Sequence, residues 1–216
     1  PSLSDNEKAI EYLSEALANS HYDSEGTVMF ALDVASSEFF DGKRYQLCRG
    51  TRSLSSEDLV SLLVTFAKQY PIISIEDGMA ESDWDGWSHL TSELGSQIQL
   101  TGDDLFVTNA KTLEHGISKG VANSILIKPN QIGTLTETFE TFHRAKAAGY
   151  AITISHRSGE TEDTTIADLA VALGPCQIKT GSLTRSERVA KYNRLLRIEE
   201  HLNGDAKYSG ATAFPQ

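Results

Sequence analysis

The sequence predicts an α/β protein made of parallel βα units, a barrel of the TIM type, and three observations support this fold class. Short apolar runs of strand length alternate with stretches of helical periodicity along the 216 residues. No linker or low-complexity segment interrupts that alternation, so we expect one domain over residues 1–216. Each apolar run ends in polar or charged residues, at the strand end where βα folds bind their ligands.

The first part of the chain predicts a helix, a buried strand and a hairpin. Ser4 followed by Glu7 is a capping-box pattern at the start of a helix. One face of this helix carries Ile10, Leu13 and Leu17. Residues 27–35, TVMFALDVA, predict a buried strand whose apolar run ends at Asp33. Residues 39–45, around an Asp41-Gly42 turn, predict a small hairpin.

The chain then alternates regularly between helix and strand. A helix is predicted over 56–69, with apolar residues at helical spacing: Leu59, Leu62, Leu63 and Phe66. A strand within 71–79 ends its apolar run at Glu76, and a strand within 98–104 ends near Asp103. The helix between these strands carries Trp87, Leu90 and Leu94. A short helix through Leu113 and Ile117 follows.

Three more strands complete the series. SILI at 124–127 ends at Lys128, AITISHR delivers His156, and CQIKTGS ends at Lys179. Thr134 and Glu137 form a capping box for a helix with Leu135, Phe139 and Phe142 inward. The next helix stripe is Ile166, Leu169 and Leu173. The last long helix, over 185–201, is predicted to bury Val189, Tyr192, Leu195 and Leu196.

The number of strands predicts an incomplete barrel. Six βα units are present where an eight-stranded barrel needs eight, and a helix with no strand before it opens the sequence. We therefore expect the barrel to begin upstream of Pro1. The alternative is a doubly wound open sheet, which usually has a glycine-rich phosphate loop after its first strand. Here that loop reads DVASS from Asp33, which favours the barrel.

Composition restricts the classes of partner. The chain has 19 Lys and Arg against 30 Asp and Glu, a formal charge of −11, which argues against nucleic acid and anionic membranes as partners. Cys48 and Cys176 lack metal-type spacing, so a zinc site or disulfide framework is not expected and a reducing, cytoplasmic setting is the default. No apolar run is long enough for a membrane span, and no signal peptide is recognisable.

Three of the strand ends carry carboxylates: Asp33, Glu76 and Asp103. The carboxyl ends of parallel strands meet at one mouth, where the mutual repulsion of three carboxylates is relieved by a cation or by protonation. Ligation by oxygen alone selects Mg²⁺ or a similar hard ion. The alternative for each carboxylate is a helix N-cap or loop position. Asp77 and Asp104, the next residues along, are expected to support the ligands or cap the loops.

The other strand ends carry cations. A lysine near a bound divalent cation is less readily protonated, so Lys128 or Lys179 is suited to act as a base near neutral pH. The alternative for a single lysine is a side chain that reaches water past the strand end. A metal, a neutral lysine and a second cation together make a site for α-proton abstraction. Arg157 and Ser158 add groups suited to phosphate.

Six motifs in the same order and spacing resemble the enolase family, the 2-phosphoglycerate hydratases. They are ALDVASSEF, SIEDGMAESDWDGW, LTGDDLFVTN, ILIKPNQIGTL, ISHRSGETEDT and IKTGSLTRSERVAKYNRLLRIEE, and the resemblance extends from about Leu3 to Leu202. It implies that Asp33, Glu76 and Asp103 are the Mg²⁺ ligands. It also implies that Lys128 takes the C2 proton and that Lys179 neutralises the substrate carboxylate. The substrate-binding loop would be His156, Arg157 and Ser158, with Arg157 on the phosphate.

The resemblance also implies properties of the complete protein. We expect a glycolytic hydro-lyase that forms phosphoenolpyruvate, a homodimer or octamer, in the cytoplasm with a possible cell-surface pool. The family's acid, a glutamate in a Gly-Asp-Glu-Gly-Gly motif, is expected before Pro1, together with an N-terminal domain. The 216 residues alone are therefore expected to have negligible turnover. The alternatives are a different dehydratase of the enolase superfamily and a non-enzymatic binding or scaffold role.

Overall fold

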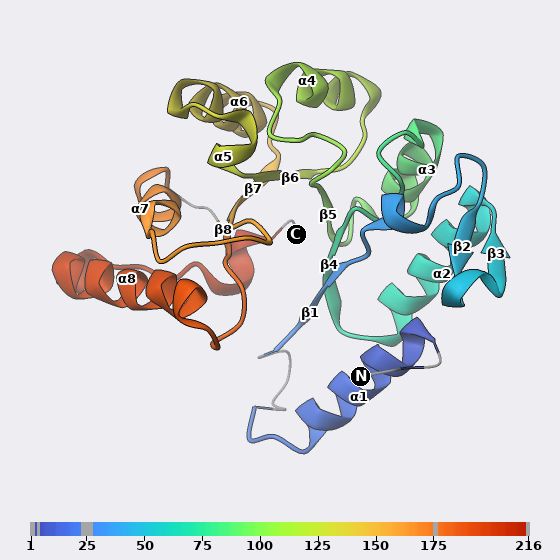
Figure 1. Cartoon of the computed structure of the whole chain (residues 1–216), viewed down its shortest axis with the longest axis horizontal. Helices are drawn as coiled ribbons and strands as arrows, with labels where there is room; N and C mark the ends of the chain where they lie inside the picture. Colours follow the sequence, from blue (N-terminus) through green and yellow to red (C-terminus); the bar gives the residue numbers. More distant parts are fainter. Residues whose placement is uncertain (1–2, 4, 23–27, 175–176, 215–216) are drawn as a thin grey trace. The chain divides into compact units, whose positions relative to one another are not determined.

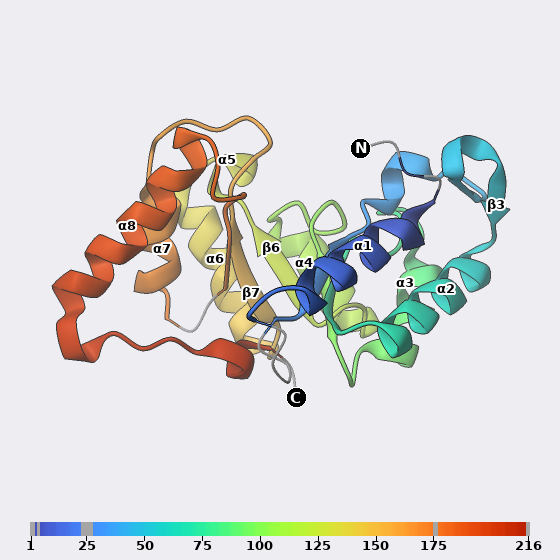
Figure 2. The ribbon, with the colours of Figure 1, turned by 90° about the horizontal axis from the view of Figure 1, so that it is seen from below.

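The structure is a computed structural model that describes residues 3, 5–22, 28–174 and 177–214. Its ribbon shows alternating helices and strands (Figures 1 and 2). The chain divides into two compact units, which we call unit 1 and unit 2. Unit 1 consists of residues 1–105 and 120–122, and unit 2 consists of residues 106–119 and 123–216.

Unit 1 contains three parallel strands, in the order β1 (Phe30–Asp33), β4 (Ile72–Glu76) and β5 (Gln99–Gly102). Asp33 is in register with Glu76, and Glu76 is in register with Thr101, so adjacent strands end at the same level. The helices of this unit are α1 (Asn6–Ala18), α2 (Ser56–Gln69) and α3 (Trp84–Leu94). The predicted helix over 56–69 is confirmed at both of its ends.

The predicted hairpin at 39–45 is only partly correct. Residues Ser36–Phe39 form a 3₁₀ helix, and only an isolated bridge between Phe40 and Tyr45 joins the two sides of the Asp41-Gly42 turn. The antiparallel ladder is instead formed by β2 (Tyr45–Leu47) and β3 (Arg52–Leu54), which a 3₁₀ turn at Cys48–Gly50 connects. The Tyr45 ring is fully buried and its hydroxyl donates to Asp83, so the first residue of β2 is anchored in the core of unit 1.

The core of unit 1 consists of apolar side chains from α2, α3 and the strands. Leu59, Leu63, Phe66, Ile75, Trp87, Leu90 and Leu100 are all buried. The first helix contributes less than its pattern predicts, because Ile10 is buried whereas Leu13 is 55% exposed. Asp5 caps α1 by accepting from the Lys8 N–H; the predicted cap Ser4 lies outside the described residues.

Unit 2 also contains three parallel strands, in the order β6 (Ser124–Ile127), β7 (Ala151–Ser155) and β8 (Gln177–Lys179). Its helices are α4 (Ala110–Lys119), α5 (Pro129–Ile132), α6 (Leu135–Ala147), α7 (Thr165–Ala172) and α8 (Ser186–Leu202). Two 3₁₀ turns, Asn203–Asp205 and Gly210–Ala213, follow α8. Helices α6 and α7 lie on one face of the strands, α6 against β6 and β7 and α7 against β7 and β8 (Figure 1).

The core of unit 2 is centred on β6 and β7. Every residue of β6 is buried, as predicted for a strand covered on both faces. Two predicted inward residues are wrong, because Leu135 is 49% and Leu196 is 62% exposed. Helix α8 instead buries Arg188 and Lys191, and α6 buries Thr138 and Thr141 beside Phe142. The helix periods were therefore correct, but in α8 the buried face carries cations.

The strand order within each unit agrees with the predicted series of βα units. Neighbouring strands of each unit are consecutive in the series and run parallel. The predicted α/β class of parallel βα units is therefore confirmed. Among the described residues, no helix is both long and apolar enough to cross a membrane.

Candidate active site

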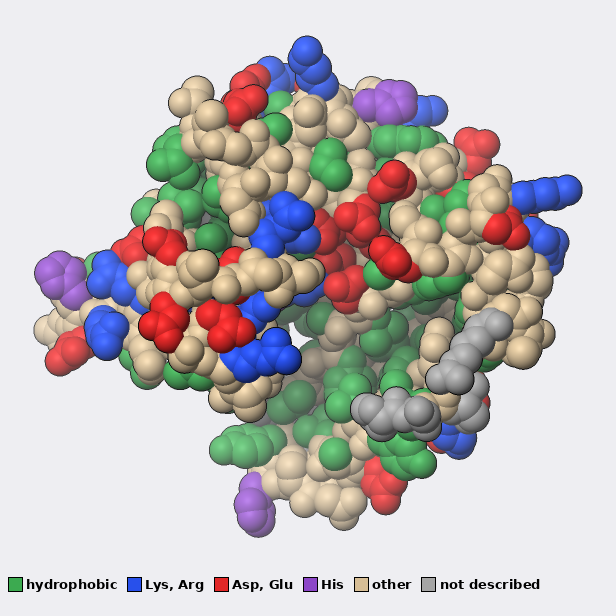
Figure 3. Space-filling model, in the orientation of Figure 1, with side chains coloured by type: hydrophobic (Ala, Val, Ile, Leu, Met, Phe, Trp, Pro, Cys, Tyr) green, Lys and Arg blue, Asp and Glu red, His purple; other side chains and the backbone are tan. Residues whose placement is uncertain are grey.

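In unit 1 the structure brings the three predicted carboxylates to the ends of adjacent strands. Asp33 and Glu76 are the last residues of β1 and β4 and pair in register, and Asp103 follows β5 directly. Glu76 and Asp103 are each 8% exposed, whereas Asp33 is exposed. On the face shown in Figure 3, acidic side chains gather over the region of β4 and β5.

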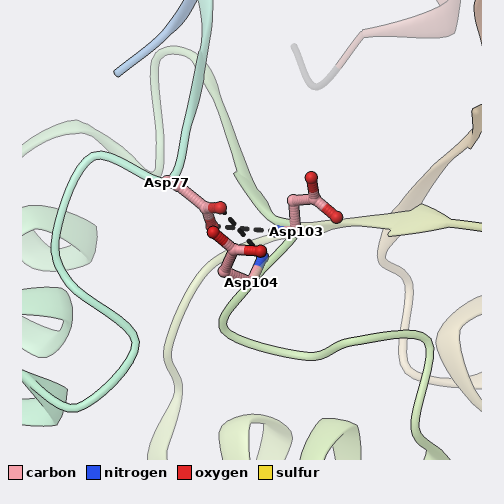
Figure 4. A group of neighbouring side chains, drawn as sticks. All are labelled: Asp77, Asp103 and Asp104. Carbon is pink, nitrogen blue, oxygen red and sulfur yellow. Dashed lines mark hydrogen bonds between the residues drawn. The ribbon is translucent and has the colours of Figure 1, made fainter. Parts of the chain in front are cut away.

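Asp77 organises the loop that carries Asp103. Its carboxylate accepts the backbone N–H groups of Asp103 at 2.9 Å and of Asp104 at 2.8 Å (Figure 4). Its own N–H donates to the Thr101 carbonyl, and its φ of 43° places it in the left-handed region. Burial, with the nearby carboxylates of Asp103 and Asp104, raises the pKa of Asp77 from 3.8 to about 7. The capping role predicted for this residue is confirmed.

The donor set of unit 1 fits a hard cation. One carboxylate oxygen from each of Asp77, Asp103 and Asp104 lies within 4.8 Å of the other two. All of these donors are carboxylate oxygens, and placing them in a buried position is costly without a compensating charge. Both Asp77 oxygens already accept backbone N–H groups, so this side chain is better suited to holding the loop than to ligating. The compact group thus includes Asp103 of the predicted ligands but not Asp33 or Glu76.

In unit 2 Lys128 stands where the sequence predicts it, directly after β6 and before the short helix α5. Its N–H donates to the Thr108 hydroxyl at 2.9 Å, and that hydroxyl donates to Gln131. Thr108 is fully buried, has a φ of 55°, and accepts from Thr141 on α6 through its carbonyl. The backbone of the predicted base is therefore anchored by a strained, buried threonine, which sequence patterns did not reveal.

His156 and Lys179 are brought together by the pairing of β7 with β8. The Lys179 carbonyl accepts the His156 N–H at 3.0 Å and lies 2.8 Å from the ring Nδ1. Because a carbonyl only accepts, Nδ1 carries the proton and Nε2 is left as the acceptor of the ring. Burial is the main cause that lowers the pKa of His156 below its usual value of 6.5, which favours the neutral form of the ring.

Arg157 and Ser158 begin a loop whose backbone is held by α8. Arg188 donates to the carbonyls of both residues, each at 2.9 Å. Glu160 accepts the Arg157 N–H at 3.0 Å and receives Lys191 on its other oxygen at 2.6 Å. Sequence reasoning missed these supporting residues, since lysine and arginine on a surface helix are expected to be exposed. The only available signal was their i, i+3 spacing on one helix face.

A cavity in unit 2 is separate from these residues. It has a volume of about 550 Å³, and Asp168, Arg194 and Ile198 are among the residues of α7 and α8 that line it. None of the predicted site residues lines it. The candidate site is therefore defined by the strand ends, not by this cavity.

Comparison with known proteins gives the family. Residues 1–216 match the family model described as "Enolase, C-terminal TIM barrel domain". The chain belongs to the enolase family. Over 214 residues it is 58% identical to a protein named "Enolase" from Rubrobacter xylanophilus, an overlap of 99% of this chain and 50% of that protein. The chain thus spans about half the length of the curated relative it matches.

Membership of the enolase family confirms the resemblance drawn from the six motifs. It also confirms the barrel over the doubly wound alternative, because the matched domain of the family is a TIM barrel. The structure gives the positions of the predicted site residues at or just after the strand ends. For Asp103, Lys128, His156, Arg157 and Ser158 it also gives hydrogen-bond partners of the backbone. Their roles in binding and catalysis stay predictions.

Proposed function

We propose that the natural protein carrying this chain is an enolase that interconverts 2-phosphoglycerate and phosphoenolpyruvate. The observation that carries this proposal is the 58% identity to a protein named enolase over 99% of the chain. The strand ends support it, because unit 1 supplies buried carboxylates and unit 2 supplies lysines, a histidine and an arginine. These are the groups that α-proton abstraction next to a carboxylate requires.

We propose Mg²⁺ as the cofactor. Asp33, Glu76 and Asp103 would hold it, and their oxygen donors are of the kind that this hard ion prefers. When bound, Mg²⁺ supplies positive charge that stabilises the enolate form of the substrate. Asp77 keeps the Asp103 loop in place through its two backbone hydrogen bonds.

In the proposed reaction Lys128 Nζ accepts the proton from C2 of 2-phosphoglycerate. Lys179 neutralises the substrate carboxylate, Arg157 binds the phosphate, and His156 and Ser158 complete the contacts to substrate. Hydroxide then leaves C3 with the help of a general acid that donates a proton to it. The balance is one water lost for each phosphoenolpyruvate formed.

The proposal extends to the setting of the complete protein. We propose a cytoplasmic homo-oligomer, a dimer or octamer, that acts on a small phosphorylated acid. The formal charge of −11 does not favour nucleic acid as a partner.

The test is turnover by the purified natural protein. Phosphoenolpyruvate formation from 2-phosphoglycerate is measured with Mg²⁺ present and after its removal by a chelator, and we expect activity only with the metal. Lys128→Ala is the test variant, and Lys111→Ala is its control. Lys111 is an exposed lysine on α4 of the same unit. Absence of phosphoenolpyruvate with the unaltered protein and Mg²⁺ would refute the proposed function.

A further inference from the structure

Two cations of α8 are buried against the 156–161 loop, which is defined here as residues His156 to Thr161. Lys191 is 0% exposed, and its ammonium donates to Glu160, the Thr161 carbonyl and the Glu187 carbonyl at 2.5–2.7 Å. Three acceptors match the three N–H donors of a lysine. The ammonium therefore has a complete set of hydrogen bonds without water.

Arg188, one helical turn before, contacts the same loop by a different geometry. It is 8% exposed, and its two terminal nitrogens donate to consecutive carbonyls, those of Arg157 and Ser158. Gly181 leaves room for this side chain: a Cβ at that position would lie 2.7 Å from Arg188 Cδ. The guanidinium thus reaches the loop because a neighbouring residue has no side chain.

Together the two cations fix both backbone polar groups of Arg157. Its carbonyl accepts from Arg188, and its N–H donates to Glu160, which Lys191 holds. Rotation of the peptide groups that flank Arg157 would break at least one of these charge-assisted bonds. The backbone of the residue proposed to bind phosphate is therefore held on both sides by α8.

Stability alone is a poor explanation for this arrangement. A buried ion pair is often no more stable than apolar side chains of similar volume, since two charges must lose their hydration. What buried, fully bonded charges do supply is a single orientation. The two α8 cations bind the backbone of the 156–161 loop, which carries the proposed binding group Arg157. Small displacements of a binding group have large effects on binding and catalysis.

We propose that Arg188 and Lys191 are positioning residues that set the Arg157 side chain for the phosphate of the substrate. This inference rests on the proposed function. Neither cation is proposed to touch the substrate: Arg188 acts through the loop carbonyls, and Lys191 acts through Glu160.

The first test compares steady-state kinetics of three variants in the natural protein. We expect Lys191→Met and Arg188→Met each to raise the KM for 2-phosphoglycerate by ~10- to 10²-fold, with kcat within about threefold. Arg194→Met is the matched control, because Arg194 lies on the same helix but pairs with Asp168 on α7. A purely structural role would lower the fraction of folded enzyme, which reduces kcat and leaves KM unchanged. That pattern, or an unchanged KM, would overturn the inference.

A double-mutant cycle tests whether the effect passes through Arg157. In an Arg157→Met background, Lys191→Met should change KM by less than about threefold, because the group that it positions is gone. An equally large effect in both backgrounds would contradict the proposed route. If Lys191→Met does not fold, Glu160→Gln takes its place, since it keeps the side-chain shape and removes the charge that Lys191 binds.

Hydrogen exchange separates this inference from the proposed function. The amide of Arg157 should exchange at least ~10-fold faster in Lys191→Met than in the unaltered protein, and Arg194→Met should leave it unchanged. This result would support the positioning contact even if 2-phosphoglycerate proved not to be a substrate. An unchanged amide would overturn the inference whatever the turnover.

Discussion

The strand-end loops of the two units are held by buried charges of opposite sign. In unit 1 the Asp77 carboxylate accepts the backbone N–H groups of Asp103 and Asp104. In unit 2 the Arg188 guanidinium donates to the backbone carbonyls of Arg157 and Ser158. In each unit the supporting charge has the same sign as the functional charge that its loop carries.

This pairing of like charges has an electrostatic consequence. Burial is the main cause that raises the pKa of Asp77, and the carboxylates of Asp103 and Asp104 raise it further. Burial is likewise the main cause that lowers the pKa of His156, and the cations Arg188 and Lys179 lower it further. Carboxyl groups thus gather around the Asp103 loop in unit 1, and cations gather around His156 in unit 2. A cation and an anionic substrate respectively would relieve these concentrations of like charge, which is consistent with the proposed ligands of each unit.

The largest expected effect lies in unit 2 and removes the reacting group itself. Lys128→Ala in the natural protein should lower kcat by ~10² to 10⁴ or more and abolish exchange of the substrate C2 proton with solvent. Proton NMR in D₂O measures that exchange directly. Lys111→Ala, an exposed lysine of the same unit, should behave as the unaltered protein does. Normal exchange in Lys128→Ala would move the base to another residue, with Lys179 the next candidate.

The next effect lies in unit 1 and concerns the proposed metal ligands. Glu76→Gln and Asp103→Asn should each weaken Mg²⁺ binding by on the order of 10²-fold, because a hard ion loses a charged oxygen donor. Calorimetric titration of the natural protein provides the affinity. Glu93→Gln, an exposed carboxylate on α3, is the control. Unchanged Mg²⁺ affinity in both ligand variants would show that the metal assignment is wrong.

The strands could be predicted from sequence because each has a strong local signal. The apolar run before Lys128 fits a strand covered on both faces, and all four of its residues are buried. The same signal located Asp33, Glu76 and Lys179 at strand ends, where the structure has them. Since adjacent parallel strands end at one level, the approximate grouping of the site residues within each unit followed from topology alone.

The supports could not be predicted, because they depend on contacts between distant residues. The Glu160–Lys191 pair joins positions 31 residues apart, and the Thr108–Lys128 contact joins positions 20 apart. Helix periodicity predicted an apolar buried face for α8, yet Leu196 is exposed and Arg188 is buried. The hairpin predicted at 39–45 was only partly correct for a similar reason, since Tyr45 is held by Asp83, 38 residues further along the chain, and pairs in β2 with β3.

A smaller effect concerns the stability that the Glu160–Lys191 contact gives to unit 2. At pH 7, Glu160→Gln should lower the free energy of unfolding by about 1–3 kcal/mol, because Lys191 stays buried without its anionic partner. Burial acts to raise the pKa of Glu160, but the Lys191 ammonium and the Arg157 N–H hold it below 4.5.

The sign of the pH dependence follows from that lowered pKa. An acid whose pKa is lower in the folded state contributes its full stabilisation at pH values above its unfolded pKa. This stabilisation is lost as the pH falls through the folded pKa. The stability difference between the unaltered protein and Glu160→Gln should therefore narrow below pH 4.5. Urea unfolding followed by circular dichroism at pH 7 and pH 4 measures it, and equal stabilities at pH 7 would contradict the expectation.

The smallest effect concerns the field at His156, where the comparison between the units is most direct. The pKa of the ring should lie below 6.5 because the ring is partly buried and faces the Arg188 and Lys179 cations, whereas the hydrogen bond to the Lys179 carbonyl and the charge of Glu160 act to raise it. When the ring is neutral, its proton is on Nδ1, which faces that carbonyl. Because the pKa of this base is lower in the folded state than in the unfolded state, it contributes stability at pH values above its unfolded pKa. This contribution is lost as the pH falls below 6.5.

NMR of the ring Cε1–H, assigned with His156→Gln, gives the titration midpoint of His156. Lys179→Met removes one cation but keeps the carbonyl, so the midpoint should rise by less than about one unit. A midpoint at or above 6.5 in the unaltered protein would show that the positive field of unit 2 does not extend to this ring.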